Sequence, residues 1–299
     1  MARLTLLGAA GLAMLLAASA RAGDSPSVGP YEDVLEVLAV HAWHLDDDLY
    51  RRAAATDAAG RSVHLATVER LDGWRKRFPT RLADVVDYAR AQALERLGAW
   101  DDATATYERV AGVPGSPLRE PAAAALERTR RFAAADALPE EGATLQDVID
   151  ALDAKLEAWR EAATGEIDET HRRLALVEIE RLEVRAATLL VRHRHALRDG
   201  EATAERALRA LIERHPESKL LPRHVLRLAD FYADEAEDYA DQADRPLDFD
   251  AKTFDRLVDR ALDAYQKLAS WDGIPEKPIA SARFDAMTSL RDATREARE

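Results

Sequence analysis

Apolar residues recur at helical spacing along nearly the whole chain from Pro30 onward, without the β-branched alternation that marks strands. In the first stretch the apolar stripe consists of Tyr31, Leu35, Leu38, Ala42, Leu45 and Leu49. Gly29 and Pro30 suit the N-cap and N1 positions of a helix, and two acids come directly after them. The same periodicity predicts further helices over 61–77, 81–98, 100–112, 117–135, 145–163, 168–198, 201–214, 219–243, 251–270 and 277–297. We therefore predict an all-α chain of about 10–11 helices.

The segments between the predicted helices are short, which favours antiparallel neighbours and hence stacked helical hairpins, an α-solenoid. The clearest break is 136–143, which contains a proline and a glycine. It separates predicted hairpins over 30–135 from a second set over 145–299. In the second set, 168–198 predicts one long connecting helix of about 45 Å at 1.5 Å per residue. Its apolar stripe consists of Leu176, Ile179, Leu182, Ala186, Leu190, His193 and Leu197.

Residues 1–22 have the pattern of a secretory signal peptide. Arg3 supplies the charged region, an apolar run extends over 4–18, and small residues come next. We expect cleavage after Ala20 or Ala22, with an uncleaved anchor as the alternative. The apolar run is short for a membrane-spanning helix. The chain is therefore predicted to be secreted or periplasmic.

Charge and cysteine usage narrow the possible partners. The chain has no cysteine, so we predict that it is not a lipoprotein and forms neither disulfides nor thiolate metal sites. The formal net charge is −13, and the signal segment contributes only positive charges. Nucleic acid and anionic lipid are therefore poor partners for the mature chain. No later stretch is apolar enough to span a bilayer, so we expect a soluble mature chain without a membrane span.

A pattern of four residues recurs along the chain: a small residue, Leu or Tyr four positions later, an apolar residue three further on, and then a proline. Its occurrences are Thr67, Leu71, Trp74, Pro79; Ala103, Tyr107, Val110, Pro114; Ala204, Leu208, Leu211, Pro216; and Ala261, Tyr265, Leu268, Pro275. The small residue lets two helices approach, the large residues fill the seam between them, and the proline ends the helix. A single hairpin cannot bury such a face, so the pattern predicts stacking.

Two stretches carry a resemblance to a known family. The first extends from residue 91 to residue 114, and its characteristic residues are Ala91, Leu94, Leu97, Gly98, Trp100, Ala103, Tyr107 and Pro114. Here the chain resembles the tetratricopeptide repeat (TPR) family at the junction between a repeat's two helices. The second stretch, over 204–232, is similar to the variant repeats of bacterial envelope proteins, among them lipoproteins of β-barrel assembly. The missing lipidation cysteine and an insertion at 241–250 depart from that pattern.

The resemblance implies that the first helices of the repeats line a concave groove, which binds a peptide or a partner domain and performs no chemistry. The groove positions carried over in this way are Asp87, Arg90, Leu94, Arg223, Arg227 and Tyr232. We therefore expect an extracytoplasmic scaffold that binds a partner protein or peptide of unknown identity, in cell-envelope assembly or maintenance.

The alternative is a helical protein that binds a metal or a small ligand. His41, His44 and Asp48 are spaced i, i+3, i+7, so they share one helix face and can ligate a metal. However, one helix supplies at most three ligands, and the same face continues to Val34 and Val37. This continuation favours histidines at the edge of an apolar core.

Other conspicuous residues are explained without chemistry. His193 lies on an apolar stripe and is expected to be a hydrogen-bonded core histidine. The acidic run over 234–250 lacks the glycine and the closing Glu of an EF-hand, which favours a solvated face. The tryptophans are expected in the core or at helix seams: Trp43, Trp74, Trp100, Trp159 and Trp271. No recognised catalytic or nucleotide-binding motif occurs, so we predict no enzyme, no catalytic residue and no cofactor.

Overall fold

We describe the chain from a computed structural model that covers residues 30–45, 47, 49–50, 61–165, 167–241 and 249–297. Every regular element among these residues is an α-helix, which confirms the predicted all-α class. The predicted signal segment 1–22 and Asp48 lie outside the described residues. None of the helices described is both long enough and apolar enough to cross a membrane. The chain divides into two compact units, which we take in turn.

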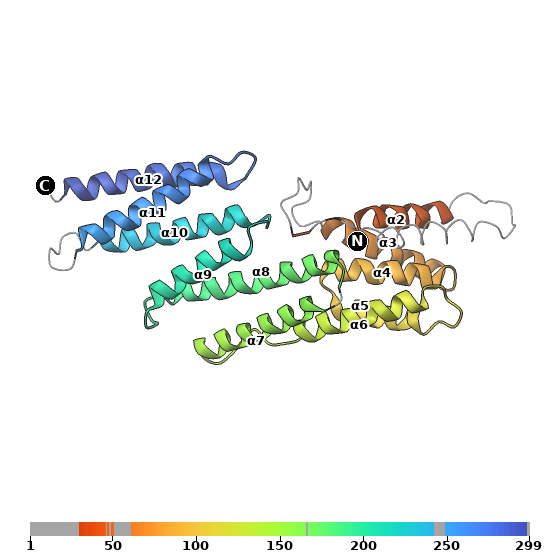
Figure 1. Cartoon of the computed structure of the whole chain (residues 1–299). Helices are drawn as coiled ribbons and strands as arrows, with labels where there is room; N and C mark the ends of the chain where they lie inside the picture. Colours follow the sequence, from red (N-terminus) through yellow and green to blue (C-terminus); the bar gives the residue numbers. More distant parts are fainter. Residues whose placement is uncertain are drawn as a thin grey trace. The chain divides into compact units, whose positions relative to one another are not determined.

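The helices of the first unit, within the described residues, are α2 (Pro30–His44), α3 (Arg61–Arg77), α4 (Ala83–Leu97), α5 (Trp100–Ala111) and α6 (Arg119–Asp136). Consecutive helices pack together from α2 to α6, and α4 also contacts α2 (Figure 1). The junction of α4 and α5 is tight because Gly98, with a φ of 73°, ends α4 in the left-handed conformation. Its backbone N–H donates to the carbonyl of Glu95, which closes the last turn of the helix.

The buried face of α2 differs from the predicted stripe. The residues that it buries are Val34, Val37, Leu38 and His41. They form their own i, i+3, i+4, i+7 series, and this series packs on α3 and α4. Leu35 of the predicted stripe is 40% exposed, and the helix ends at His44 instead of continuing to Leu49. Trp43 lies off the buried face and is 82% exposed, so its predicted place in the core or at a seam was wrong.

The second unit contains α7 (Leu145–Thr164), α8 (Glu169–Arg192) from His171 onward, α9 (Gly200–Arg214), α10 (Leu221–Ala240), α11 (Ala251–Ala269) and α12 (Glu276–Glu296). Helices α9 to α12 pack in chain order, and α12 also contacts α10 (Figure 1). One continuous apolar cluster fills this part of the unit. Its large members include Leu211, Phe231, Tyr232, Phe254, Tyr265 and Leu268.

The predicted long helix over 168–198 is wrong at its C-terminal end. α8 stops at Arg192, and residues 193–199 form turns in which Arg194 N–H donates to Val191 O, three residues back. The chain then folds back tightly. A Cβ on Gly200 would lie 2.0 Å from the carbonyl oxygen of Arg194, so only glycine allows this approach. As a result His193 lies on no helical stripe and is half-exposed, not the core histidine predicted.

The recurring four-residue pattern falls on α3, α5, α9 and α11. Its small and large members are at most 3% exposed in every occurrence, and the prolines are exposed. Three of the prolines come just beyond the end of their helix, whereas Pro275 is the N-cap of α12. Three of the tryptophans, Trp74, Trp100 and Trp159, are also buried, and Trp271 is half-buried. The pattern therefore marks the seams that each of these helices makes with its neighbours.

Candidate partner-binding site

Three of the groove positions carried over by resemblance lie on α4, in the first unit. Asp87 is buried between two arginines of neighbouring helices. Arg75 of α3 has its Nε 3.0 Å from Asp87 Oδ1, and Arg109 of α5 has its Nε 3.8 Å from Oδ2. Leu94 is 5% exposed and contributes little surface. The charge of Asp87 is thus neutralised inside the unit.

Arg90 connects the same three helices. Its Nε donates to Asp72 Oδ1 of α3 at 2.6 Å, and its Nη1 donates to Thr106 Oγ1 of α5 at 3.1 Å. Together with Asp87 it forms a charged ladder that fixes α4 between α3 and α5. A ligand at these positions would meet side chains that are already held in place.

A buried carboxylate that the sequence reasoning missed anchors the next part of the unit. Glu95 is 2% exposed and accepts hydrogen bonds from Tyr107 Oη at 2.7 Å, Thr129 Oγ1 at 2.6 Å and Arg128 Nη2 at 3.0 Å. Burial, together with the charge of Glu95, raises the pKa of Tyr107 well above its usual value. The three donors come from α5 and α6, so Glu95 joins three helices through one group.

The other three groove positions lie on α10, in the second unit. Tyr232 is buried; its Oη donates to Glu205 Oε1 at 2.8 Å and accepts from Arg209 Nη2 at 3.1 Å. Arg223 is exposed, with its Nε 3.7 Å from Glu276 Oε1. Burial lowers the pKa of the nearby Arg227, and the charge of Arg223 adds to this effect. Of these three, only the arginines offer surface to a partner.

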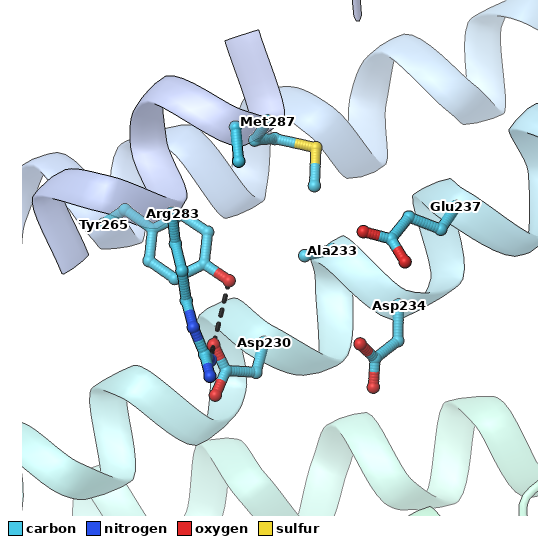
Figure 2. A pocket seen from close by; sticks show the side chains of 8 residues that line it. Asp230, Ala233, Asp234, Glu237, Tyr265, Arg283 and Met287 are labelled. Atoms are coloured by element: carbon cyan, nitrogen blue, oxygen red, sulfur yellow. Dashed lines mark hydrogen bonds and ion pairs between the residues drawn. The ribbon is translucent and has the colours of Figure 1, made fainter. Parts of the chain in front are cut away.

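A pocket of about 330 Å³ lies among α10, α11 and α12. Figure 2 shows Tyr265 of α11 and Arg283 of α12 meeting at Asp230, with Asp234 and Glu237 further along α10. The Tyr265 hydroxyl donates to Asp230 Oδ1 at 2.8 Å, and Arg283 forms an ion pair with the same carboxylate. Burial raises the pKa of Tyr265, as do the charges of Asp234 and Glu237. Hydrogen bonding at one end of the pocket is therefore satisfied.

At the other end of the pocket lie two carboxylates, Asp234 and Glu237. Neither Asp234 nor Glu237 forms an ion pair or side-chain hydrogen bond within the part of the chain that the structure describes. Partial burial raises the pKa of Asp234, and Asp238 adds to this effect while Arg194 opposes it. Because the cation that lines the pocket, Arg283, is paired with Asp230, the pocket favours a positively charged group, such as a lysine or arginine side chain.

His41 and His44, two members of the proposed metal-binding face, lie in different surroundings. His41 is completely buried, with its ring centroid 6.1 Å from that of His64. Burial, followed by the charge of His64, lowers the pKa of His41 to about 3. His44 is partly exposed and pairs with Asp47, and the third member, Asp48, is outside the described residues.

A different group of potential metal ligands was missed by the sequence reasoning. His195, Glu235 and Asp238 place ligand atoms within 4.8 Å of one another, as no other trio does among the described residues. However, Arg194 pairs with Glu235 and donates from Nη2 to Asp238 Oδ2 at 3.2 Å, so an arginine already supplies the positive charge. The sequence did not indicate this group, because His195 is far from Glu235 and Asp238 along the chain.

The second unit also contains two buried histidine–glutamate pairs. His224 Nε2 lies 2.6 Å from Glu180 Oε1, and His215 Nε2 lies 3.0 Å from Glu183 Oε2. The hydroxyl of Tyr50 lies 2.7 Å from the other ring nitrogen of His215. Burial would raise the pKa of Glu183, but the bonds from His215 and then from arginines outweigh it, and the pKa is lowered. These groups are enclosed and join α8 to α9 and α10.

The pocket of α10, α11 and α12 thus combines volume with two exposed carboxylates that form no ion pair among the described residues, whereas the charged side chains on α4 and the buried histidine–glutamate pairs are bound to partners within the chain. Comparison of the sequence with protein-family models finds no match, and comparison with the curated proteins finds none either.

Proposed function

We propose that this chain is an extracytoplasmic scaffold of TPR-like hairpins that holds a partner protein or peptide, in the assembly or maintenance of a cell envelope. The observation that carries the proposal is the open pocket among α10, α11 and α12, with two carboxylates that the described part of the chain leaves unpaired. A side chain fits the volume of this pocket, and a basic one supplies the missing charge.

The fold supports this role. Four seams with the same small-large-large pattern stack the helices, as in repeat proteins that bind through an extended surface. The pattern of residues 1–22 supports export, and the absence of cysteine supports a mature chain without a lipid anchor.

Crosslinking in cells tests the proposal. The variant Asp234→Lys, Glu237→Lys reverses both unpaired charges of the pocket. Its matched control, Glu213→Lys, Asp263→Lys, makes the same change in charge at two exposed acids of α9 and α11. We expect one reproducible crosslinked protein with the wild type and the control, reduced at least about tenfold with the pocket variant, because the two lysines would face the basic group of the partner and like charges at an interface are costly.

The proposal fails if the pocket variant retains the same crosslinked protein as the control. It also fails if no reproducible partner is captured while the purified chain carries a stoichiometric metal. That second outcome would support a helical metal-binding protein. If the metal is bound by His195, Glu235 and Asp238, we expect the metal content to fall in His195→Ala and to be retained in His44→Ala.

A further inference from the structure

Three cations of the second unit converge on one carboxylate. Glu140 lies in the irregular segment between α6 and α7, and Arg181 of α8 holds it as a fork, with Nη2 donating to Oε1 at 2.7 Å and Nη1 to Oε2 at 3.1 Å. Lys155 of α7 has its Nζ 3.0 Å from Oε1. Arg185 pairs with Oε2 and also donates to the backbone carbonyl of Glu140 at 3.2 Å. We call Lys155, Arg181 and Arg185 the cradle.

The electrostatics of the cradle are those of a carboxylate site. The hydrogen bonds from Arg181 lower the pKa of Glu140 to about 2; burial opposes this shift, and Lys155 adds to it. Bidentate pairing of an arginine with a carboxylate adds geometric specificity to the charge attraction. The geometry of the cradle therefore fits two oxygens on one carbon.

The cradle is also accessible from solvent. It borders a pocket of about 460 Å³ that Leu138, Pro139 and Glu141 help to line. The side chains of Arg181 and Arg185 are 43% and 42% exposed, whereas that of Lys155 is 5% exposed and forms the floor. An incoming group can thus reach both arginines from the open side.

The positions of the charged residues in the fold suggest that Glu140 moves more easily than the three cations. The three cations stand on α7 and α8, where backbone hydrogen bonds fix their positions, while Glu140 stands on a segment without helical structure. Arg181 also contacts a second acid, because its Nε donates to Glu178 Oε2 at 2.7 Å.

We propose that the cradle is a subsite for an acidic side chain of the partner, and that Glu140 is its intramolecular occupant, which the partner's carboxylate displaces. This inference rests on the proposed function, since the partner supplies the acidic segment. Glu140 holds the cradle in its binding geometry when the partner is absent. Glu140 also makes binding selective, because only a ligand that replaces its contacts with the three cations can occupy the cradle.

Fluorescence anisotropy with purified full-length chain tests the subsite. The probe is a fluorescein-labelled Gly-Ser peptide with two central glutamates, and its control contains glutamines instead. We expect Glu140→Gln to bind the acidic peptide at least about tenfold more tightly than the wild type, because the competing carboxylate is gone. The double variant Glu140→Gln, Arg185→Gln should lose this gain, and Glu141→Gln, which changes another acid lining the same pocket, should behave as the wild type.

The inference is overturned if Glu140→Gln gains no affinity, if the glutamine peptide binds equally well, or if inorganic phosphate at equal concentration displaces the acidic peptide. Hydrogen exchange on the wild type gives a second test that does not depend on the folding of a variant. Saturating acidic peptide should speed exchange over 138–143, and unchanged exchange there overturns the displacement. Either failure would leave the proposed function intact, provided that a partner is crosslinked through the pocket of α10.

Discussion

The buried His41 makes the first unit sensitive to acid. His41 of α2 is completely buried beside His64 of α3, and its pKa is lowered to about 3, first by burial and then by the charge of His64. Arg96 and His44 add positive charge nearby, while the side chain of Gln92 opposes the shift. The folded unit therefore binds a proton at this site far less readily than the unfolded chain.

The sign and the size of the effect follow from this difference. Above the ordinary histidine pKa of 6.5 both states are neutral at His41, and the full stability is present. As the pH falls below that value the unfolded chain takes up the proton and the folded unit does not, so stability is lost at about 1.4 kcal/mol per pH unit until the pH reaches about 3. Between pH 6.5 and pH 5 the expected loss is about 2 kcal/mol.

Native-state hydrogen exchange of the α2–α4 amides, measured from about pH 7.5 to about pH 5 and corrected for intrinsic exchange, assigns the effect to this unit. His41→Leu removes the titrating group, and we expect it to flatten the pH dependence of the opening free energy. The partly exposed His44 provides the matched control, so His44→Leu should retain the slope of the wild type. An unchanged slope in His41→Leu would refute the reasoning.

Three further predictions concern stability and are checked by chemical denaturation. Glu95→Ala strands the donors of a buried network and should cost about 3 kcal/mol, whereas loss of the exposed Glu127 should have no measurable effect; equal effects would contradict the anchoring role. Gly200→Ala places a Cβ against a carbonyl oxygen and should destabilise by more than about 2 kcal/mol, whereas Gly73→Ala, with open space in α3, should stabilise by about 0.5 to 1 kcal/mol. Leu211→Ala empties a seam and should cost about 2 to 5 kcal/mol; a loss below about 1 kcal/mol would show that the seam collapses on mutation.

Much of the fold could be predicted from local patterns. The small-large-large pattern located the seams on α3, α5, α9 and α11 because the residues that each of these helices contributes to its seam are close together in the sequence. The prediction of the buried face of α2 was wrong because two apolar series overlap in this helix. Only the packing on α3 and α4 decides which of them is buried. The predicted end of α8 was wrong because the apolar stripe in the sequence continues beyond Arg192. The chain instead turns after this residue, and the turn brings Gly200 close to the backbone of Arg194.

The candidate sites were harder to predict because their parts come from distant segments. The α10 pocket combines Asp234 and Glu237 with Tyr265 and Arg283 from two later helices, and no spacing in the sequence indicates that they meet. The acidic run itself was interpreted as a solvated face, which is correct for Asp234 and Glu237 but wrong for Glu235, which is 4% exposed. This interpretation does not reveal the pocket. Likewise, the partners of Glu140 depend on how its segment crosses α7 and α8.

The most direct test of the scaffold role is site-specific photo-crosslinking in cells. A photo-crosslinking amino acid at Ala286, which is exposed and lines the α10 pocket, is compared with the same group at Ser281, which is exposed on the same helix and does not line it. The account predicts one reproducible protein joined to position 286, absent from position 281 and lost when Asp234 and Glu237 are changed to lysine. Identical products from both positions, or none from position 286, would contradict it.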